Sequence, residues 1–418
     1  MKLREGLMAK SWFTNINNKI KSLFIKTQTI NQDKDHLLEL PRFLKTDIKE
    51  YVESLDCPTT YQDSVQNAIA PILKKWLENP EAENSIVILG NPVENLSKII
   101  DNSIENWKGD RPTLEIITPL PFSHRPRNFL TITEQIKQSF ELHPQVEIEN
   151  LNDIDTIPDE ESLEERTTII VIPNLEQLFL RDIEGWNSVI FLREIIIHNP
   201  NCFWIIGCNH LAWDFLNYVC QIKAYFNSIH ALPTLDGEML KNWLDPVVKT
   251  VVSNKFTQNQ QLINDTSEDN RDESYWTYLA EESSGIPSIA LNLWINSLRL
   301  DKDNVEEDKL AQITFEDILD QKSQYTLQQI TPRLPDLASL TIDDRYLVHS
   351  VLIHNHINRT HLALSLGEPE SQIEARIQRL LRESILIREN GALSIAPPYY
   401  KKLKQELINN NFFVGEQL

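Results

Sequence analysis

The sequence predicts an α/β protein with three layers, in which a parallel β-sheet lies between two layers of helices. A helical region and a small C-terminal domain are expected to follow. The first half of the chain alternates short apolar, β-branched runs with helix-like stretches. Runs that are apolar throughout are typical of parallel strands, because these are buried on both faces of a sheet. Their alternation with helices is typical of βαβ units.

Five runs are the expected strands of this sheet: 86–90, 114–118, 167–172, 202–207 and 228–232. Between them, the spacing of apolar residues predicts helices over 96–107, 185–198 and 211–226. The stretch 233–300 is expected to be helical, with helices over 237–253 and 275–298.

The C-terminal part has the most specific local pattern in the chain. Helices are expected over 340–354, 359–366 and 370–384, followed by two short strands around Asn390-Gly391. An Asn-Gly pair between apolar runs is a strong hairpin signal, and three helices followed by a hairpin predict a winged helix-turn-helix. The predicted domains are a basic amphipathic N-terminal segment at 1–40, the α/β core at 41–232, the helical lid at 233–330 and the winged helix at 331–418.

Charge and glycine content limit the classes of function. The chain has 418 residues and a net charge of −21 at pH 7, so nucleic-acid binding would need a local basic patch. It has ten glycines, and the closest pair, Gly90 and Gly109, lies 19 positions apart. Intact dinucleotide-binding, P-loop and kinase glycine-rich motifs need two glycines within about six residues. The sequence therefore excludes intact versions of all three motifs.

Four cysteines without a CxxC pair predict a reducing compartment with no disulfide framework. No run approaches the length of a membrane span, and a cytoplasmic location is expected. The N-terminal 26 residues carry six basic side chains and one acid. Within residues 10–26 the apolar side chains share one helical stripe, which predicts peripheral contact with an anionic membrane, docking on an acidic partner, or packing on its own domain.

A nucleotide site would be expected where the first strand of the sheet ends. That strand runs into Gly90-Asn91-Pro92-Val93-Glu94-Asn95-Leu96-Ser97-Lys98. Together with the order of the other pieces over residues 45–410, this stretch resembles the AAA+ and STAND branches of P-loop ATPases, especially their initiator-like modules. The resemblance implies a three-layer, P-loop-NTPase-like core, a helical lid and a C-terminal winged helix. An unrelated α/β domain with a chance similarity is the alternative.

Against the pattern GxxxxGK[ST], this stretch keeps Gly90 and Ser97 but has Asn95 at the second glycine and Leu96 at the lysine. That lysine supplies positive charge to the β- and γ-phosphates. Lys98 is one position out of register, and on a helix it points away from the direction of Leu96.

The other charged positions that the resemblance implies are missing as well. Pro173 stands where the magnesium-associated aspartate would be, and Asn174 and Glu176 are the nearest polar candidates. Glu176 could be a displaced general base. Asn209 stands at the sensor position after the fourth strand, whereas Ser288 replaces the lid arginine. No arginine occurs between Arg193 and Arg271, so a finger arginine after the sensor strand is also absent.

The favoured interpretation is a catalytically inactive AAA+/STAND-like protein without a cofactor, which acts as a regulatory or assembly subunit through protein partners. One alternative is a switch that binds ATP weakly through a degenerate site; its candidate residues are Gly90, Ser97, Lys98, Asn174, Glu176 and Asn209. The other is a DNA-binding regulator that uses basic residues of the winged helix: Arg376, Arg379, Arg382 and Arg388. The oligomeric state is left open.

A histidine cluster in the winged helix has a simpler interpretation. His354, His356 and His361 have no carboxylate or cysteine at the spacing of a metal site. We expect them to be surface histidines.

Overall fold

A computed structural model describes most of the α/β core and the C-terminal part of the chain. The described residues are 37–107, 114–120, 125, 132–142, 146, 166–251, 268–301, 313, 318 and 327–414. The basic stretch 10–26 lies outside them. The chain divides into two compact units, one with residues 1–55, 244–279 and 293–333, the other with residues 56–243, 280–292 and 334–418.

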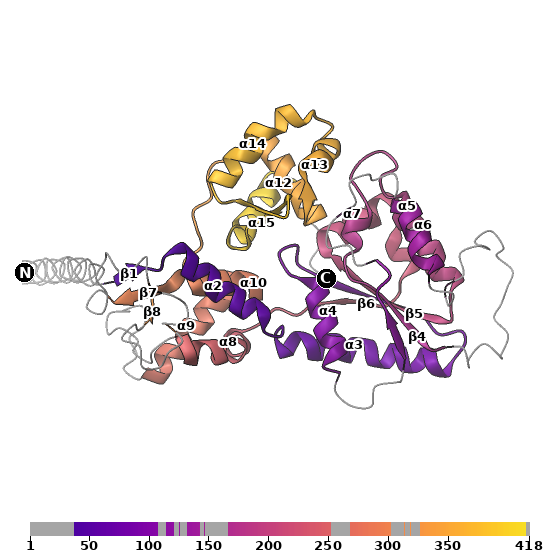
Figure 1. Ribbon diagram of the computed structural model, residues 1–418, viewed down its shortest axis with the longest axis horizontal. Coiled ribbons are helices and arrows are strands. Elements are labelled where there is room, and N and C mark those ends of the chain that lie inside the picture. The colour runs from indigo at the N-terminus through magenta and orange to yellow at the C-terminus, as the bar shows by residue number, and fades with distance from the viewer. Residues whose placement is uncertain are drawn as a thin grey trace, which may run out of the picture. The chain divides into compact units, whose positions relative to one another are not determined.

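The larger unit contains the predicted sheet (Figure 1). Its five strands are β2 (Ser85–Gly90), β3 (Glu115–Ile117), β4 (Thr168–Ile172), β5 (Cys202–Asn209) and β6 (Ile229–Ala231). They pair in the order β3-β4-β5-β2-β6, and every pair is parallel. All five predicted strands are confirmed.

The connections explain the layers. The chain leaves β2 for β3 at the far edge, returns through β4 to β5, and then passes over β2 to β6. Because such crossovers are right-handed, the first must lie on one face of the sheet and the later ones on the other. Figure 1 accordingly shows α3 (Thr59–Glu78) and α4 (Leu96–Glu105) on one face. The opposite face carries α5 (Ile132–Glu141), α6 (Asn187–His198) and α7 (His210–Cys220). This confirms the P-loop-NTPase-like fold class.

Successive residues of β5 contact the two helical layers in turn, as the pleat of a strand requires. Phe203 packs against Trp76 of α3 with ring centroids 5.5 Å apart. Trp204 packs against Phe140 of α5 at 5.7 Å. Gly207 lies four residues after Phe203 on the same strand. A Cβ at Gly207 would lie 2.3 Å from the carbonyl oxygen of Pro173. Close contact between the ends of β4 and β5 therefore requires a glycine at this position.

The smaller unit contains a sheet that the sequence analysis missed. Its strands β1 (Leu37–Glu39), β7 (Leu298–Asp301) and β8 (Leu327–Gln329) pair antiparallel in the order β1-β7-β8. Helix α2 (Arg42–Ser54) buries Leu44, Ile48 and Val52, which are spaced for one helical face. The strands are too short for the alternation of polar and apolar residues to stand out in the sequence.

Two predicted helices are shorter than expected. The stretch 275–298 is divided into α9 (Glu268–Ser283) and α10 (Pro287–Ser297), and α8 (Gly237–Val251) precedes them. The break occurs because Ser284 and Gly285 both have positive φ, and a Cβ on Gly285 would lie 2.6 Å from the carbonyl oxygen of Leu235. The stretch 211–226 ends as an α-helix at Cys220, because Gln221 is left-handed (φ +51°), and a 3₁₀ turn follows.

The C-terminal domain, residues 334–414, has its elements in the order predicted for a winged helix. Three helices, α12 (Ile342–His354), α13 (Arg359–Leu366) and α14 (Glu370–Arg382), are followed by the hairpin strands β10 (Leu386–Glu389) and β11 (Ala392–Ile395). Strand β9 (Ile357–Asn358) pairs with β11, and α15 (Tyr400–Asn409) ends the domain. Among the described helices, none combines the length and apolarity that a membrane crossing needs.

Candidate functional site

The candidate site lies at the carboxyl edge of the sheet, between β2 and β5. Gly90 at the end of β2 pairs with Asn209 at the end of β5. The connection after β2 runs toward one edge of the sheet and the connection after β5 toward the other. Such a topological switch point is where open α/β sheets bind ligands. The structure thus brings two of the predicted site residues, Gly90 and Asn209, to the expected place.

In the loop after β2, the carboxylate of Glu94 binds donors of the chain itself. The Glu94 side chain is 5% exposed, and its Oε2 accepts hydrogen bonds from the backbone N and the Nδ2 of Asn91, both at 2.8 Å. Its Oε1 accepts a hydrogen bond from the Tyr61 hydroxyl at 2.5 Å. Burial raises the pKa of Glu94, although these hydrogen bonds oppose the shift. In an intact P-loop, backbone N–H groups cradle phosphate; here the Asn91 amide already binds the carboxyl group of Glu94.

The lysine position of the loop is filled by an apolar contact. Leu96 is buried, and its Cδ1 lies 3.3 Å from the position that a Cβ on Gly90 would occupy. Asn95 caps α4, because its Oδ1 accepts a hydrogen bond from the backbone N of Lys98 at 3.1 Å. The Ser97 hydroxyl faces Asp101 Oδ2 at 3.4 Å. None of these contacts places a positive charge inside the loop.

Glu176 and Asn209 lie together at the carboxyl end of β5, the strand that pairs with β2 at the switch point. Glu176 is 2% exposed, and its Oε2 accepts a hydrogen bond from the backbone N of Asn209 at 3.3 Å. Burial raises the pKa of Glu176 to about 7. Asn209 caps α7 through Ala212 N at 2.9 Å. Asn174 is only half-buried and precedes the 3₁₀ turn that contains Glu176.

A buried arginine that the sequence analysis missed lies beside this pair. Arg125 donates hydrogen bonds to the carbonyl oxygens of Phe179 at 2.7 Å and Glu176 at 2.5 Å. Burial lowers its pKa to about 9. Arg125 belongs to none of the predicted strands or helices, so no local pattern singled it out.

The expectation of surface histidines is wrong for His354 and His361, which are fully buried. His354 packs its ring on Phe179, with centroids 5.0 Å apart, and its Nε2 accepts a hydrogen bond from the backbone N of Arg181 at 3.2 Å. Burial, together with the charges of Arg125 and Arg181, holds the pKa of His354 well below its usual value. The imidazole is therefore neutral. Its burial depends on contacts between the C-terminal domain and the core, which periodicity within one helix does not reveal.

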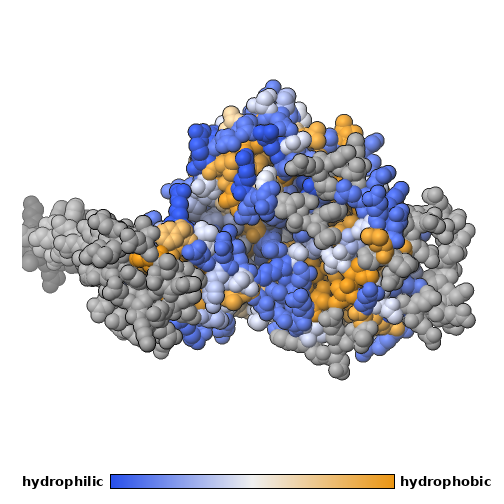
Figure 2. All heavy atoms as spheres, viewed as in Figure 1, coloured by the Kyte–Doolittle hydropathy of each residue, from blue (hydrophilic) through white to orange (hydrophobic). Residues whose placement is uncertain are grey.

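The four arginines predicted for DNA contact divide into two pairs. Arg376 forms an ion pair with Glu368, and Arg379 with Asp344, a fully buried residue that belongs to the capping box of α12. Arg382 and Arg388 are exposed. Figure 2 shows mostly hydrophilic side chains on the visible face of the C-terminal domain, with apolar areas between them. Half of the predicted basic set is thus already neutralised within the domain.

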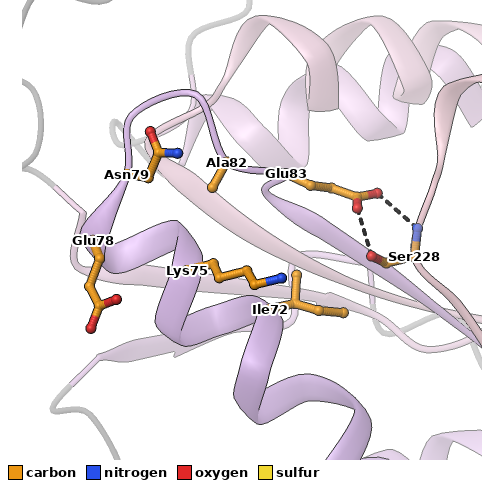
Figure 3. Close-up of a pocket in the computed structure, with 7 residues that line it drawn as sticks. All are labelled: Ile72, Lys75, Glu78, Asn79, Ala82, Glu83 and Ser228. Carbon is orange, nitrogen blue, oxygen red and sulfur yellow. Dashed lines mark hydrogen bonds between the residues drawn. The ribbon is translucent and has the colours of Figure 1, made fainter.

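A hollow of about 370 Å³ lies at the opposite, amino-terminal edge of the sheet (Figure 3). The carboxylate of Glu83 at its rim accepts hydrogen bonds from the Ser228 hydroxyl at 2.6 Å and from Asn227 N at 2.9 Å. None of the predicted site residues lines this hollow. The Glu83 carboxylate is occupied by the chain's own donors, and the hollow is not at the edge where parallel sheets bind ligands.

Comparisons with known proteins identify distant structural neighbours but no relative by sequence. No family model matches the sequence, and a search of curated proteins finds no match. Among solved structures, the chain is similar to Cdc6p from Pyrobaculum aerophilum at 14% identity, over 84% of this chain and 95% of that one, with a TM-score of 0.33. The RuvB Holliday junction branch migration motor of Thermotoga maritima matches at 12% identity, over 82% and 94%, with a TM-score of 0.30.

The ORC2 protein of Aeropyrum pernix, solved in ADPNP-ADP complexes, matches at 10% identity over 82% of this chain and 91% of that one, with a TM-score of 0.33. Because these identities and TM-scores are so low, the assignment of the fold class rests on the strand order, the crossover direction and the position of the Gly90 loop.

Proposed function

We propose that this chain is a catalytically inactive relative of AAA+ ATPases, which serves as a regulatory or assembly subunit and acts through protein contacts. The observation that carries the proposal is the Glu94 carboxylate in the loop after β2, bound to the Asn91 amide and the Tyr61 hydroxyl. The loop keeps its place in the fold, yet its anion position is taken by the chain itself.

Electrostatics explains why this arrangement disfavours a nucleotide. A phosphate charge about 4 Å from an ionised Glu94 carboxylate would cost about 4 kcal/mol at an effective dielectric constant of 20. A lysine at position 96 would offset part of this repulsion, but the residue is Leu96, packed against Gly90. Pro173 at the magnesium position has no carboxylate with which to hold a metal ion. The cost therefore stays uncompensated.

The direct test is calorimetric titration with Mg-ATP, together with measurement of phosphate release. We expect neither binding at micromolar concentrations nor turnover in the wild-type chain. The double variant Glu94→Gln with Leu96→Lys should gain measurable ATP affinity, because it removes one negative charge and adds one positive charge in the loop. Glu134→Gln, at an exposed acid of α5, is the matched control and should gain none.

Tight Mg-ATP binding by the wild-type chain, or hydrolysis that disappears in Glu176→Gln, would refute the proposal. The first result would favour the ATP-binding switch, and the second would make Glu176 a displaced general base. Circular dichroism of each variant shows whether a negative result reflects lost folding.

DNA binding remains the second candidate because Arg382 and Arg388 are exposed on α14 and on the hairpin. Only two of the four arginines that the sequence offered for DNA contact are therefore exposed. Arg359 at the start of α13 forms ion pairs with Glu370 and Glu374 of α14, at 2.7 and 3.0 Å. These two acids lie on the helix that would have to enter the major groove, where phosphates on either side repel them.

A further inference from the structure

The carboxyl end of α12 places at the candidate site carbonyl groups that have no hydrogen-bond partner within the helix itself. The last four carbonyl groups of any α-helix lack partners within the helix. Two of those in α12 are bound by side chains of the core. Asn209 Nδ2 donates to the carbonyl oxygen of Ile353 at 3.0 Å, and Gln177 Nε2 donates to that of His354 at 3.0 Å. Both donors are almost completely buried, at 2% and 1% exposure.

The next residue continues the contact. Asn355 ends α12 with φ +55° and ψ −85°, an unusual backbone conformation for a residue other than glycine. Its side chain forms a hydrogen bond with the Glu176 carboxylate. The ring of His354 accepts the Arg181 amide, so three consecutive residues, 353–355, are bound by four residues of the core. A strained conformation of this kind persists when surrounding contacts hold it in place.

Charge is consistent with the same arrangement. A helix C-terminus carries about half a negative charge, and the buried guanidinium of Arg125 lies 3.3 Å from Nδ1 of His354, at the last residue of the helix. The carboxyl end of α12 thus presents to the core what a phosphate would present: oxygen acceptors and partial negative charge. Asn209 and Glu176, predicted as nucleotide positions, contact this helix end directly.

We propose that the resident ligand of the switch-point site is the carboxyl end of α12, so that the residues at the ends of β4 and β5 hold the C-terminal domain docked on the core. The inference rests on the proposed function in one respect, namely that no nucleotide occupies this edge of the sheet. It goes beyond that function by naming what the site binds and which movement it controls. Releasing α12 frees the C-terminal domain and exposes the polar groups of the site for a partner.

Two substitutions weaken the contact without removing the main packing. Gln177→Leu removes the donor to His354 and keeps a side chain of similar size. Asn355→Gly removes the contact with Glu176, and glycine adopts positive φ without strain. Each hydrogen bond lost should lower the ratio of docked to free domain by about fivefold, and the double variant by about 25-fold. Asn390→Gly is the matched control, because Asn390 also has positive φ (+51°) but lies in the exposed hairpin turn.

Hydrogen exchange of the full-length chain, followed by mass spectrometry, measures docking. The best reporter is the Arg181 amide, because its acceptor is the ring of His354 in the other domain and neither substitution touches it. In the double variant, the Arg181 amide, followed in the peptide covering 174–183, should exchange about 25-fold faster, whereas peptides of β2 and β5 stay protected. Asn390→Gly should exchange like the wild-type chain.

Unchanged exchange of 174–183 in the double variant would overturn the inference. Faster exchange in β2 and β5 as well would also overturn it, because the substituted residues would then support the core rather than the docking. Mg-ATP titration of the same variants separates this result from the proposed function. ATP binding to the wild-type chain contradicts the proposed function, whereas exchange in the variants tests the docking by itself.

Discussion

Glu176 offers a prediction that can be worked through from the structure. Its carboxyl group is buried between the end of β5 and α12, and burial raises its pKa from the ordinary 4.5 to about 7. The ionised form is therefore disfavoured in the folded chain. The stability that this group contributes is fully present below pH 4.5 and is lost as the pH rises to about 7. Glu176→Gln removes this dependence and keeps an oxygen that can accept the Asn209 amide.

The expected size follows from the two pKa values. The difference between 4.5 and about 7 corresponds to about 3 kcal/mol of unfolding free energy. Between pH 4.5 and pH 8, the stability of Glu176→Gln should thus rise by about 3 kcal/mol relative to the wild-type chain. His354 acts in the opposite direction, because its lowered pKa makes stability fall as the pH drops below 6.5. It is present in both proteins and cancels in the comparison.

Urea unfolding at several pH values, followed by tryptophan fluorescence, measures this difference. Buried tryptophans on β5 and α7, Trp204 and Trp213, report on the part of the core that contains Glu176. Glu134→Gln, at an exposed acid of α5, should keep the wild-type pH dependence. A constant difference between Glu176→Gln and wild type across the pH range would show that the folded chain does not disfavour ionisation of Glu176, and the reasoning would fail.

Two further predictions concern the packing of the core and the basic residues of the C-terminal domain. Gly207→Ala should lower the stability of the core by about 3 kcal/mol or more, because its Cβ would lie 2.3 Å from the Pro173 carbonyl oxygen; thermal unfolding measures the loss. The double variant Arg382→Ala with Arg388→Ala should abolish any retardation of DNA seen at low salt, and the wild-type chain should show none at physiological salt.

Each of these has its own control. Gly391→Ala has positive φ (+86°) but no atom within 4 Å of the added Cβ, so it should cost only about 1 kcal/mol. Equal losses from the two glycine substitutions would argue against the contact between the ends of β4 and β5. Arg359→Ala is the control for DNA binding, because its charge is already paired with Glu370 and Glu374. Retardation that persists at physiological salt and needs Arg382 and Arg388 would support the DNA-binding alternative.

The sequence was sufficient for the sheet and its layers. Residues 86–89 and 169–172 are apolar throughout, and such runs are typical of strands that are buried on both faces of a parallel sheet. The Asn390-Gly391 hairpin was equally predictable, because few residue pairs adopt two consecutive positive φ angles. The break at Gly285 was missed because it depends on Leu235, a residue 50 positions away.

By itself, the sequence determined that no intact phosphate-binding loop exists, since the second glycine and the lysine are replaced by Asn95 and Leu96. Only the tertiary structure decided what occupies the site instead. Glu94 accepts a hydrogen bond from the hydroxyl of Tyr61, 33 positions away, and Arg125 lies beside His354, 229 positions away. Burial and hydrogen bonding of charged groups depend on which distant segments the fold brings together. The local sequence pattern does not reveal these long-range contacts.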